Sequence, residues 1–274
     1  MSVFRETYHV HTRFCDGQNT VEEIIKAAIA QGIQILGFSG HSYIPVVGEY
    51  GMNTATEQQY IAAVTDAKAR YAGQLDIVCG LELDAYSATP THPYEYLIGS
   101  VHCVPTPDGL KEVDHTPDIQ RDTVARYFGG DYYTYAKTYF NEIAQVREKT
   151  GCTFIGHFDL VSKYNENEHL FDETDKRYLD AGMAAIHTLC EQPGAIFELN
   201  TGALPRGART TPYPLLPFLK EIKQAGGRII FSSDSHQTDT LLFGGESMQA
   251  LAQAAGFTSR VIILKDGNLR EVAI

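Results

Sequence analysis

Residues 8–12 of the chain read Tyr-His-Val-His-Thr (YHVHT), with two imidazoles at alternate positions of a short β-rich run. Side chains two residues apart in a strand point to the same side, so His9 and His11 share one face while Val10 faces the other. Two neutral imidazoles on one face are a common ligand pair for a divalent metal ion. The stretch therefore predicts a metal site on a buried strand.

The chain around this stretch has the composition of one globular domain, residues 1–274. It is 43% hydrophobic and 20% charged, which supplies a sizeable core. It contains neither an apolar run of about 18 residues nor a basic leader followed by an apolar segment, so we expect a cytoplasmic protein without a membrane span. The five cysteines are odd in number and form no CxxC, which disfavours a disulfide framework and a zinc knuckle.

The charge pattern limits the class of partner. The formal net charge is −12, and the lysines and arginines are dispersed along the chain. A protein that binds long nucleic acids is expected to carry a basic stripe instead. We therefore expect a small-molecule partner and no long nucleic acid, and the sequence indicates no oligomeric state.

Short β-rich segments alternate with helical patterns along most of the chain. Seven segments are predicted as strands, at residues 8–12, 33–41, 75–84, 94–104, 152–160, 195–201 and 228–236. Helices are predicted at residues 21–32 with Thr20 as the N-cap, 57–73, 132–151, 174–192, 214–227 and 245–257. Residues 105–118 are interpreted as a loop, and residues 261–274 as a hairpin around an Asp-Gly turn. Repeated strand and helix units of this size favour an α/β fold, a (β/α) barrel with about seven repeats.

Possible metal ligands follow or end these strands. The set is His9, His11, Asp16, His41, Glu82, His102, His157, Asp234 and His236. The carboxyl ends of parallel barrel strands meet on one face, where we expect these side chains to form one site. Taken singly, each histidine is better explained by packing, and we assign no site role to His92, His115, His169 or His187. The sixth strand supplies no obvious ligand, although its loop carries Arg206.

The motifs and their order resemble one known superfamily. They are HxH near the start, GH ending the second strand, LE in the third, SVH in the fourth, GHFD in the fifth and SSDSH in the last. This pattern is similar to the polymerase-and-histidinol-phosphatase (PHP) superfamily, over about His9 to His236. The segment ELNTGALPRGARTTPYP looks most like the histidinol-phosphate phosphatase branch.

The resemblance implies a distorted (β/α)7 barrel with a trinuclear metal site at the C-terminal ends of the strands. It implies a first ion on His9, His11, Glu82 and Asp234, a second on Glu82, His102 and His157, and a third on Asp16, His41 and His236. The imidazole-rich set suits zinc, manganese or iron better than magnesium.

The activity implied is hydrolysis of L-histidinol phosphate in histidine biosynthesis, with a metal-bound hydroxide attacking phosphorus. Glu82, Asp234 and His236 are the expected catalytic residues; a proton for the leaving oxygen could come from Asp234, from His236 or from a bound water. Arg206 is the first candidate for binding phosphate, and Lys163 and Arg209 are weaker ones. The alternatives are a phosphoesterase for another small phosphate ester or nucleotide, and a metal-binding domain without turnover.

Overall fold

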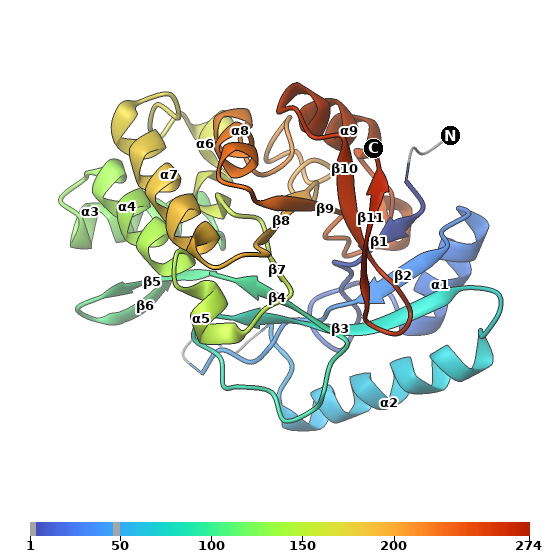
Figure 1. The fold of residues 1–274 in the computed structure, drawn as a ribbon. Coiled ribbons are helices and arrows are strands. Elements are labelled where there is room, and N and C mark those ends of the chain that lie inside the picture. Colours follow the sequence, from blue (N-terminus) through green and yellow to red (C-terminus); the bar gives the residue numbers. More distant parts are fainter. Residues whose placement is uncertain (1–3, 46–49) are drawn as a thin grey trace.

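A largely parallel sheet runs through the centre of the computed structural model, which describes residues 4–45 and 50–274 (Figure 1). The parallel strands are β1 (Glu6–Thr7), β2 (Ile35–Phe38), β3 (Asp76–Asp84), β4 (Tyr96–Ser100), β7 (Phe154–Ile155), β8 (Ile196–Asn200) and β9 (Arg228–Ser232), paired in that order. Beyond β9 the sheet continues into β10 (Ser259–Ile263) and β11 (Leu269–Ala273), which form the predicted antiparallel hairpin. The seven predicted parallel strands are confirmed.

The ring of strands is distorted where β1 meets β9. No ladder joins β1 to β9 among the described residues; instead Val10 makes one isolated parallel bridge to Ser235. The backbone N–H of Tyr8 donates to Ser232 Oγ at 3.1 Å, which helps to hold the two segments together. The predicted distorted barrel is thus confirmed as a sheet that does not close through a continuous ladder.

Helices surround the sheet and connect its parallel strands. They are α1 (Val21–Ala30), α2 (Thr54–Arg70), α3 (Pro117–Tyr127), α4 (Tyr132–Ile143), α5 (Val146–Thr150), α6 (Asn165–Glu168), α7 (Lys176–Glu191), α8 (Leu216–Gln224) and α9 (Gly245–Ala254). The predicted N-cap of α1 is confirmed, since Thr20 and Glu23 form a reciprocal capping box. No helix in the described part of the chain has the length and apolar character needed to cross a membrane.

The structure corrects three predicted boundaries. Residues 105–118 are not all loop, because β5 (Cys103–Thr106) and β6 (Gly109–Glu112) pair as a hairpin and α3 begins soon after. Its turn requires Gly109 at a φ of 94°, a conformation that glycine adopts without strain. The helix predicted at 132–151 is divided into α4 and α5, and the first regular strand lies at Glu6–Thr7, just before YHVHT.

Alternation along each strand separates the barrel interior from its outer wall. On β3, Val78 and Glu82 belong to the interior series, whereas Leu81 and Leu83 pack in the outer core with residues of α1 and α2. The lower interior is filled by Tyr8, Val78, Tyr96, Ile98, Phe154, Ile196, Ile230, Val261 and Ile263. The apolar interior therefore occupies the amino-terminal part of the strands and leaves their carboxyl ends to polar side chains.

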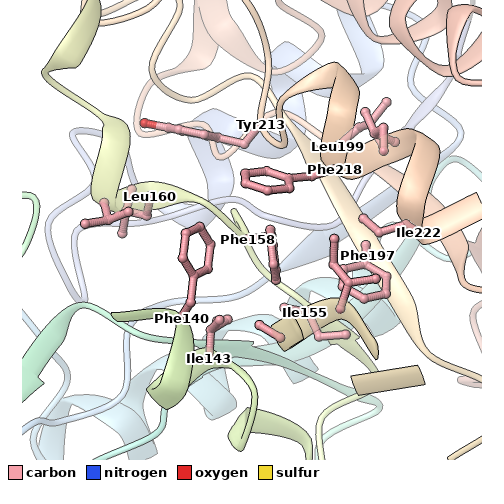
Figure 2. Packing of buried hydrophobic residues seen from close by; sticks show 14 of the residues in the cluster. Phe140, Ile143, Ile155, Phe158, Leu160, Phe197, Leu199, Tyr213, Phe218 and Ile222 are labelled. Carbon is pink, nitrogen blue, oxygen red and sulfur yellow. The ribbon is translucent and has the colours of Figure 1, made fainter. Parts of the chain in front are cut away.

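The outer wall near β7 and β8 is an aromatic core under α4 and α8 (Figure 2). Phe158 lies 5.4 Å from Phe140 of α4 and 5.6 Å from Phe218 of α8, measured between ring centroids. Figure 2 shows Tyr213 at the edge of this cluster, with its hydroxyl end pointing away from Phe218. This packing fixes the chain that follows β7 and β8, which carries His157 and Arg206.

Candidate metal centre

All nine side chains predicted as ligands come together where the parallel strands end. They are His9, His11, Asp16, His41, Glu82, His102, His157, Asp234 and His236, and each lies within 4 Å of at least one other member of the set. Most are buried, while Asp16 is the most open, with 34% of its side chain exposed. The convergence predicted from the strand ends is therefore present in the fold.

Glu82 lies at the centre of this group and is 1% exposed. Five imidazole nitrogens lie 2.8–3.6 Å from its carboxylate oxygens, from His9, His11, His41, His102 and His157. Ser100 also donates a hydrogen bond to Glu82 Oε1 at 2.7 Å. A carboxylate at the end of one strand thus contacts ligands contributed by several others.

Asp234 approaches the same histidines from the end of β9. Its Oδ1 lies 3.2 Å from His11 Nε2 and 3.7 Å from His9 Nε2. The residue has a φ of 49°, in the left-handed region that an L side chain rarely adopts. A Cβ on Gly202 would lie 2.4 Å from Asp234 Oδ2, so glycine is needed beside the carboxylate.

The carboxylate of Asp16 lies close to three histidines of the set. Its Oδ2 lies 3.1 Å from His236 Nε2 and 3.6 Å from His41 Nε2, and its Oδ1 lies 3.6 Å from His11 Nδ1. The loop after the first strand therefore reaches the group, as the sequence predicted. His11 stacks on His236 at 4.0 Å between ring centroids, which brings the inner and outer ligands into contact.

The buried carboxylates and imidazoles of this group shift one another's pKa values. Burial favours the neutral form of His102, but the carboxylates of Glu82 and Asp84 overcome it and raise its pKa to about 10. Burial also opposes the charge on Glu82, yet His41 and His9 hold the pKa of Glu82 well below its usual range. By contrast, burial and the neighbouring His236 and His41 lower the pKa of His11 to about 3. The carboxylates require cations, and His11 is neutral and able to act as a ligand.

The buried atoms fit metal ions better than hydrogen bonds. His9 Nε2, His11 Nε2 and Glu82 Oε2 are buried without a hydrogen-bond partner among the described residues, although the two nitrogens lie 3.0 and 3.6 Å from Glu82 Oε2. Buried nitrogen and oxygen atoms that converge without a hydrogen-bond partner are expected of ligands to a shared ion. Four groups of side chains place their ligand atoms within 4.8 Å of one another: His11, Asp16, His41 and His236; His9, His157 and Asp234; His9, His11 and Glu82; and His41, Glu82 and His102.

Two further carboxylates support the ligands and were missed in the sequence. Glu198 is fully buried, and its Oε1 lies 2.7 Å from His9 Nδ1 while its Oε2 accepts the backbone N–H of His157 at 2.8 Å. Asp84 Oδ2 accepts the backbone N–H of His102 at 2.9 Å and lies 3.1 Å from its Nδ1. Such partners orient an imidazole and strengthen it as a ligand. A carboxylate in the apolar run AIFELN was the available signal for Glu198.

A cavity of about 360 Å³ opens onto the ligands. Arg206 and Lys163, both predicted to bind substrate, line it, and Arg206 Nη2 lies 2.6 Å from His236 Nδ1. Arg209 does not line it: the side chain is 1% exposed, donates to Ser162 Oγ at 2.7 Å and pairs with Glu173. The expectation that Arg209 binds phosphate is therefore corrected. Its side chain holds the segment after β7 through Ser162 and does not face the cavity.

Comparison with known proteins identifies the family. The sequence profile of the PHP domain matches residues 7–202, which is more than half of the chain. The chain belongs to the PHP domain family. The PHP match ends just after β8, so Asp234 and His236 lie beyond its end.

Seven of the nine predicted ligands lie inside the matched residues: His9, His11, Asp16, His41, Glu82, His102 and His157. The remaining two, Asp234 and His236, follow β9 and are brought to the same site by the fold.

Individual relatives cover nearly the whole of this PHP chain. A protein of Schizosaccharomyces pombe named "Probable histidinol-phosphatase" is 24% identical over 289 residues, covering 95% of this chain and 90% of the relative. The histidinol-phosphatase of Bacillus subtilis is also 24% identical and covers 87% of this chain and 96% of its own. The crystal structure of a histidinol phosphate phosphatase from Lactococcus lactis, complexed with zinc, L-histidinol and phosphate, has a TM-score of 0.71 at 18% identity, covering 97% of this chain and 98% of that one. This last likeness shows a shared fold.

We predict that Glu198→Gln weakens metal binding about 10-fold to 100-fold, because an amide cannot hold His9 Nδ1 and the His157 backbone as the carboxylate does. The measurement is competition of the protein with a chromophoric zinc chelator, read together with the zinc content after dialysis.

The matched control is Glu221→Gln, because Glu221 of α8 pairs at 2.5 Å with the exposed His187 of α7 and neither residue lines the cavity. It should leave zinc affinity unchanged. Equal zinc affinity in Glu198→Gln and the unmodified protein would contradict the supporting role of Glu198.

Proposed function

We propose that the chain is a metal-dependent phosphomonoesterase that hydrolyses L-histidinol phosphate to L-histidinol and phosphate, a reaction of histidine biosynthesis. The relatives in Schizosaccharomyces pombe and Bacillus subtilis carry histidinol-phosphatase names, and the Lactococcus lactis neighbour binds zinc, L-histidinol and phosphate. The observation that carries the proposal is the convergence of nine candidate ligand side chains, five of them histidines in contact with the buried carboxylate of Glu82, beside a cavity that several of the nine line.

We further propose that these side chains hold three divalent ions, of zinc, manganese or iron. The four compact groups of ligand atoms overlap at His9, His11, His41 and Glu82, so the candidate ion positions adjoin one another, and the carboxylate of Glu82 has two oxygens with which to bridge two ions. Imidazole nitrogens favour these metals over magnesium, which prefers oxygen ligands and retains water. Zinc in the Lactococcus lactis neighbour supports the same choice.

Divalent ions supply Lewis acidity, which polarises a phosphate ester and lowers the pKa of water toward neutrality. The protein supplies the orientation and the remaining charge. Arg206 lies beside His236 at the cavity wall, where its guanidinium can donate two hydrogen bonds to phosphate oxygens. The proton for the leaving alcohol oxygen comes from Asp234, from His236 or from a bound water; both side chains line the cavity, as does Arg206.

The negative net charge of the chain does not prevent binding of a phosphate. Although the chain carries a formal charge of −12, three divalent ions would outweigh the carboxylates of Asp16, Glu82 and Asp234 locally.

We also propose a cytoplasmic enzyme, since the five cysteines are all free in the structure and suit a reducing compartment.

We predict that the zinc-loaded or manganese-loaded protein releases phosphate from L-histidinol phosphate with a kcat/KM of about 10⁴ M⁻¹s⁻¹ or more. The assay compares this ester with nucleotides, sugar phosphates and p-nitrophenyl phosphate. His157→Asn should abolish turnover through loss of a ligand, while His187→Asn on the surface should not. If another ester has the higher kcat/KM, that ester is the substrate instead of L-histidinol phosphate. If no ester is hydrolysed, the proposal is wrong.

We predict that Arg206→Met weakens inhibition by inorganic phosphate about tenfold, because a charge-assisted hydrogen bond to the anion is lost. The measurement is the inhibition constant of phosphate in the steady-state assay. Arg126→Met is the matched control, since Arg126 is an exposed, ion-paired arginine on α3. If the inhibition constant of phosphate is the same in Arg206→Met and the unmodified protein, Arg206 does not bind the phosphate.

A further inference from the structure

The wall of the cavity carries acidic residues that the proposed reaction does not use. Glu112 and Asp114 line the cavity together with Lys163, Arg206 and Tyr213. Carboxylates close to a phosphate site repel a phosphate dianion, so they lower its affinity unless the ligand also carries a positive charge. The two acids therefore need an explanation.

The hairpin register places Glu112 next to the ligands. β6 ends at Glu112, which pairs with Cys103 across the hairpin, and Cys103 directly follows the ligand His102. The backbone N–H of Val113 then donates to the carbonyl of His102 at 2.9 Å. Two hydrogen-bonded strands thus hold Glu112 at a fixed position in the cavity wall, next to the segment that carries His102.

The two acids differ in their partners. Asp114 is neutralised by Lys163, whose Nζ donates to Asp114 Oδ2 and to its carbonyl oxygen, both at 2.9 Å. Glu112 has an ion pair only with the exposed ring of His115, at 3.5 Å, and no lysine or arginine pairs with it in the part of the chain that the structure describes. Glu112 is therefore the carboxylate available to a cation in the cavity.

An independent observation indicates that the cavity receives a polar ligand. The side chain of Tyr213 lines the cavity and is 2% exposed, yet its hydroxyl has no hydrogen-bond partner among the described residues. Burial keeps the pKa of Tyr213 well above its ordinary value, so the hydroxyl stays a neutral donor. A buried donor without a partner is costly, and a polar group of a bound ligand would satisfy it.

We propose that Glu112 binds the primary ammonium group of an amino-alcohol phosphate whose phosphate lies at the metal ligands and Arg206. The inference rests on the proposed phosphatase function and adds the residue that selects the substrate. The ammonium of L-histidinol phosphate is on the carbon next to the ester CH₂, so one ligand can reach both the ligand cluster and the adjoining Glu112. Glu112 discriminates such esters from phosphates of uncharged alcohols.

The test compares L-histidinol phosphate with 3-(imidazol-4-yl)propyl phosphate, which lacks only the amine. The unmodified protein should favour the amine in kcat/KM by about tenfold or more, the size expected of one charge-assisted hydrogen bond. Glu112→Gln should reduce this ratio about tenfold, chiefly through KM, because the ammonium keeps its charge during the reaction. Glu112→Asp should restore part of it.

The matched control is Asp108→Asn, at the turn of the same hairpin, where Asp108 accepts a hydrogen bond from Tyr127 at 2.8 Å outside the cavity lining. It should leave the ratio unchanged. A ratio that is the same in Glu112→Gln and the unmodified protein would overturn the assignment of Glu112 while leaving the phosphatase function intact.

A binding measurement separates the two proposals. Calorimetry of the zinc-loaded protein with L-histidinol and with 3-(imidazol-4-yl)propan-1-ol reports the ammonium contact without turnover. If neither phosphate is hydrolysed but L-histidinol binds more tightly in a Glu112-dependent way, the phosphatase function fails and the ammonium site stands. Equal binding of both alcohols would refute the ammonium site.

Discussion

The burial of the Glu82 carboxylate among five imidazoles is the constraint on which the rest of the structure depends. An ionised carboxylate that is 1% exposed is stable only with cations and hydrogen bonds around it. Here the partners come from the ends of several parallel strands, so the barrel must place those ends within a few ångströms of one another. The apolar interior below, which includes Tyr96 and Ile98 of β4, fixes these positions.

The ligand set could be predicted from the sequence because it follows from topology. In a parallel barrel the carboxyl ends of the strands lie on one face, so each histidine or carboxylate at such an end is expected on that face. Glu198 was harder to recognise, because strands buried on both faces read as continuous apolar runs and conceal which positions face inward. Within the barrel, Glu198 lies two residues from interior Ile196, and that period of two becomes informative only when the inner face is known.

The loops were less predictable, since tertiary contacts decide the role of their charges. Arg206 and Arg209 lie three residues apart in one loop, yet Arg206 faces the cavity while Arg209 turns into a buried ion pair with Glu173. The composition of residues 105–118 suggested a loop, but an Asp-Gly turn at Gly109 forms the hairpin that carries Glu112. Local sequence specified the turn, whereas the place of the hairpin beside His102 depends on the fold.

Anomalous diffraction from crystals of the zinc-loaded protein, measured above and below the zinc absorption edge, tests the central claim most directly. Our account predicts three peaks around Glu82, each within ligand distance, about 2.0–2.2 Å, of side-chain nitrogens or oxygens from the nine-residue set. A single peak, or peaks that have no contact with Glu82, would contradict the shared centre and the hydrolytic function built on it.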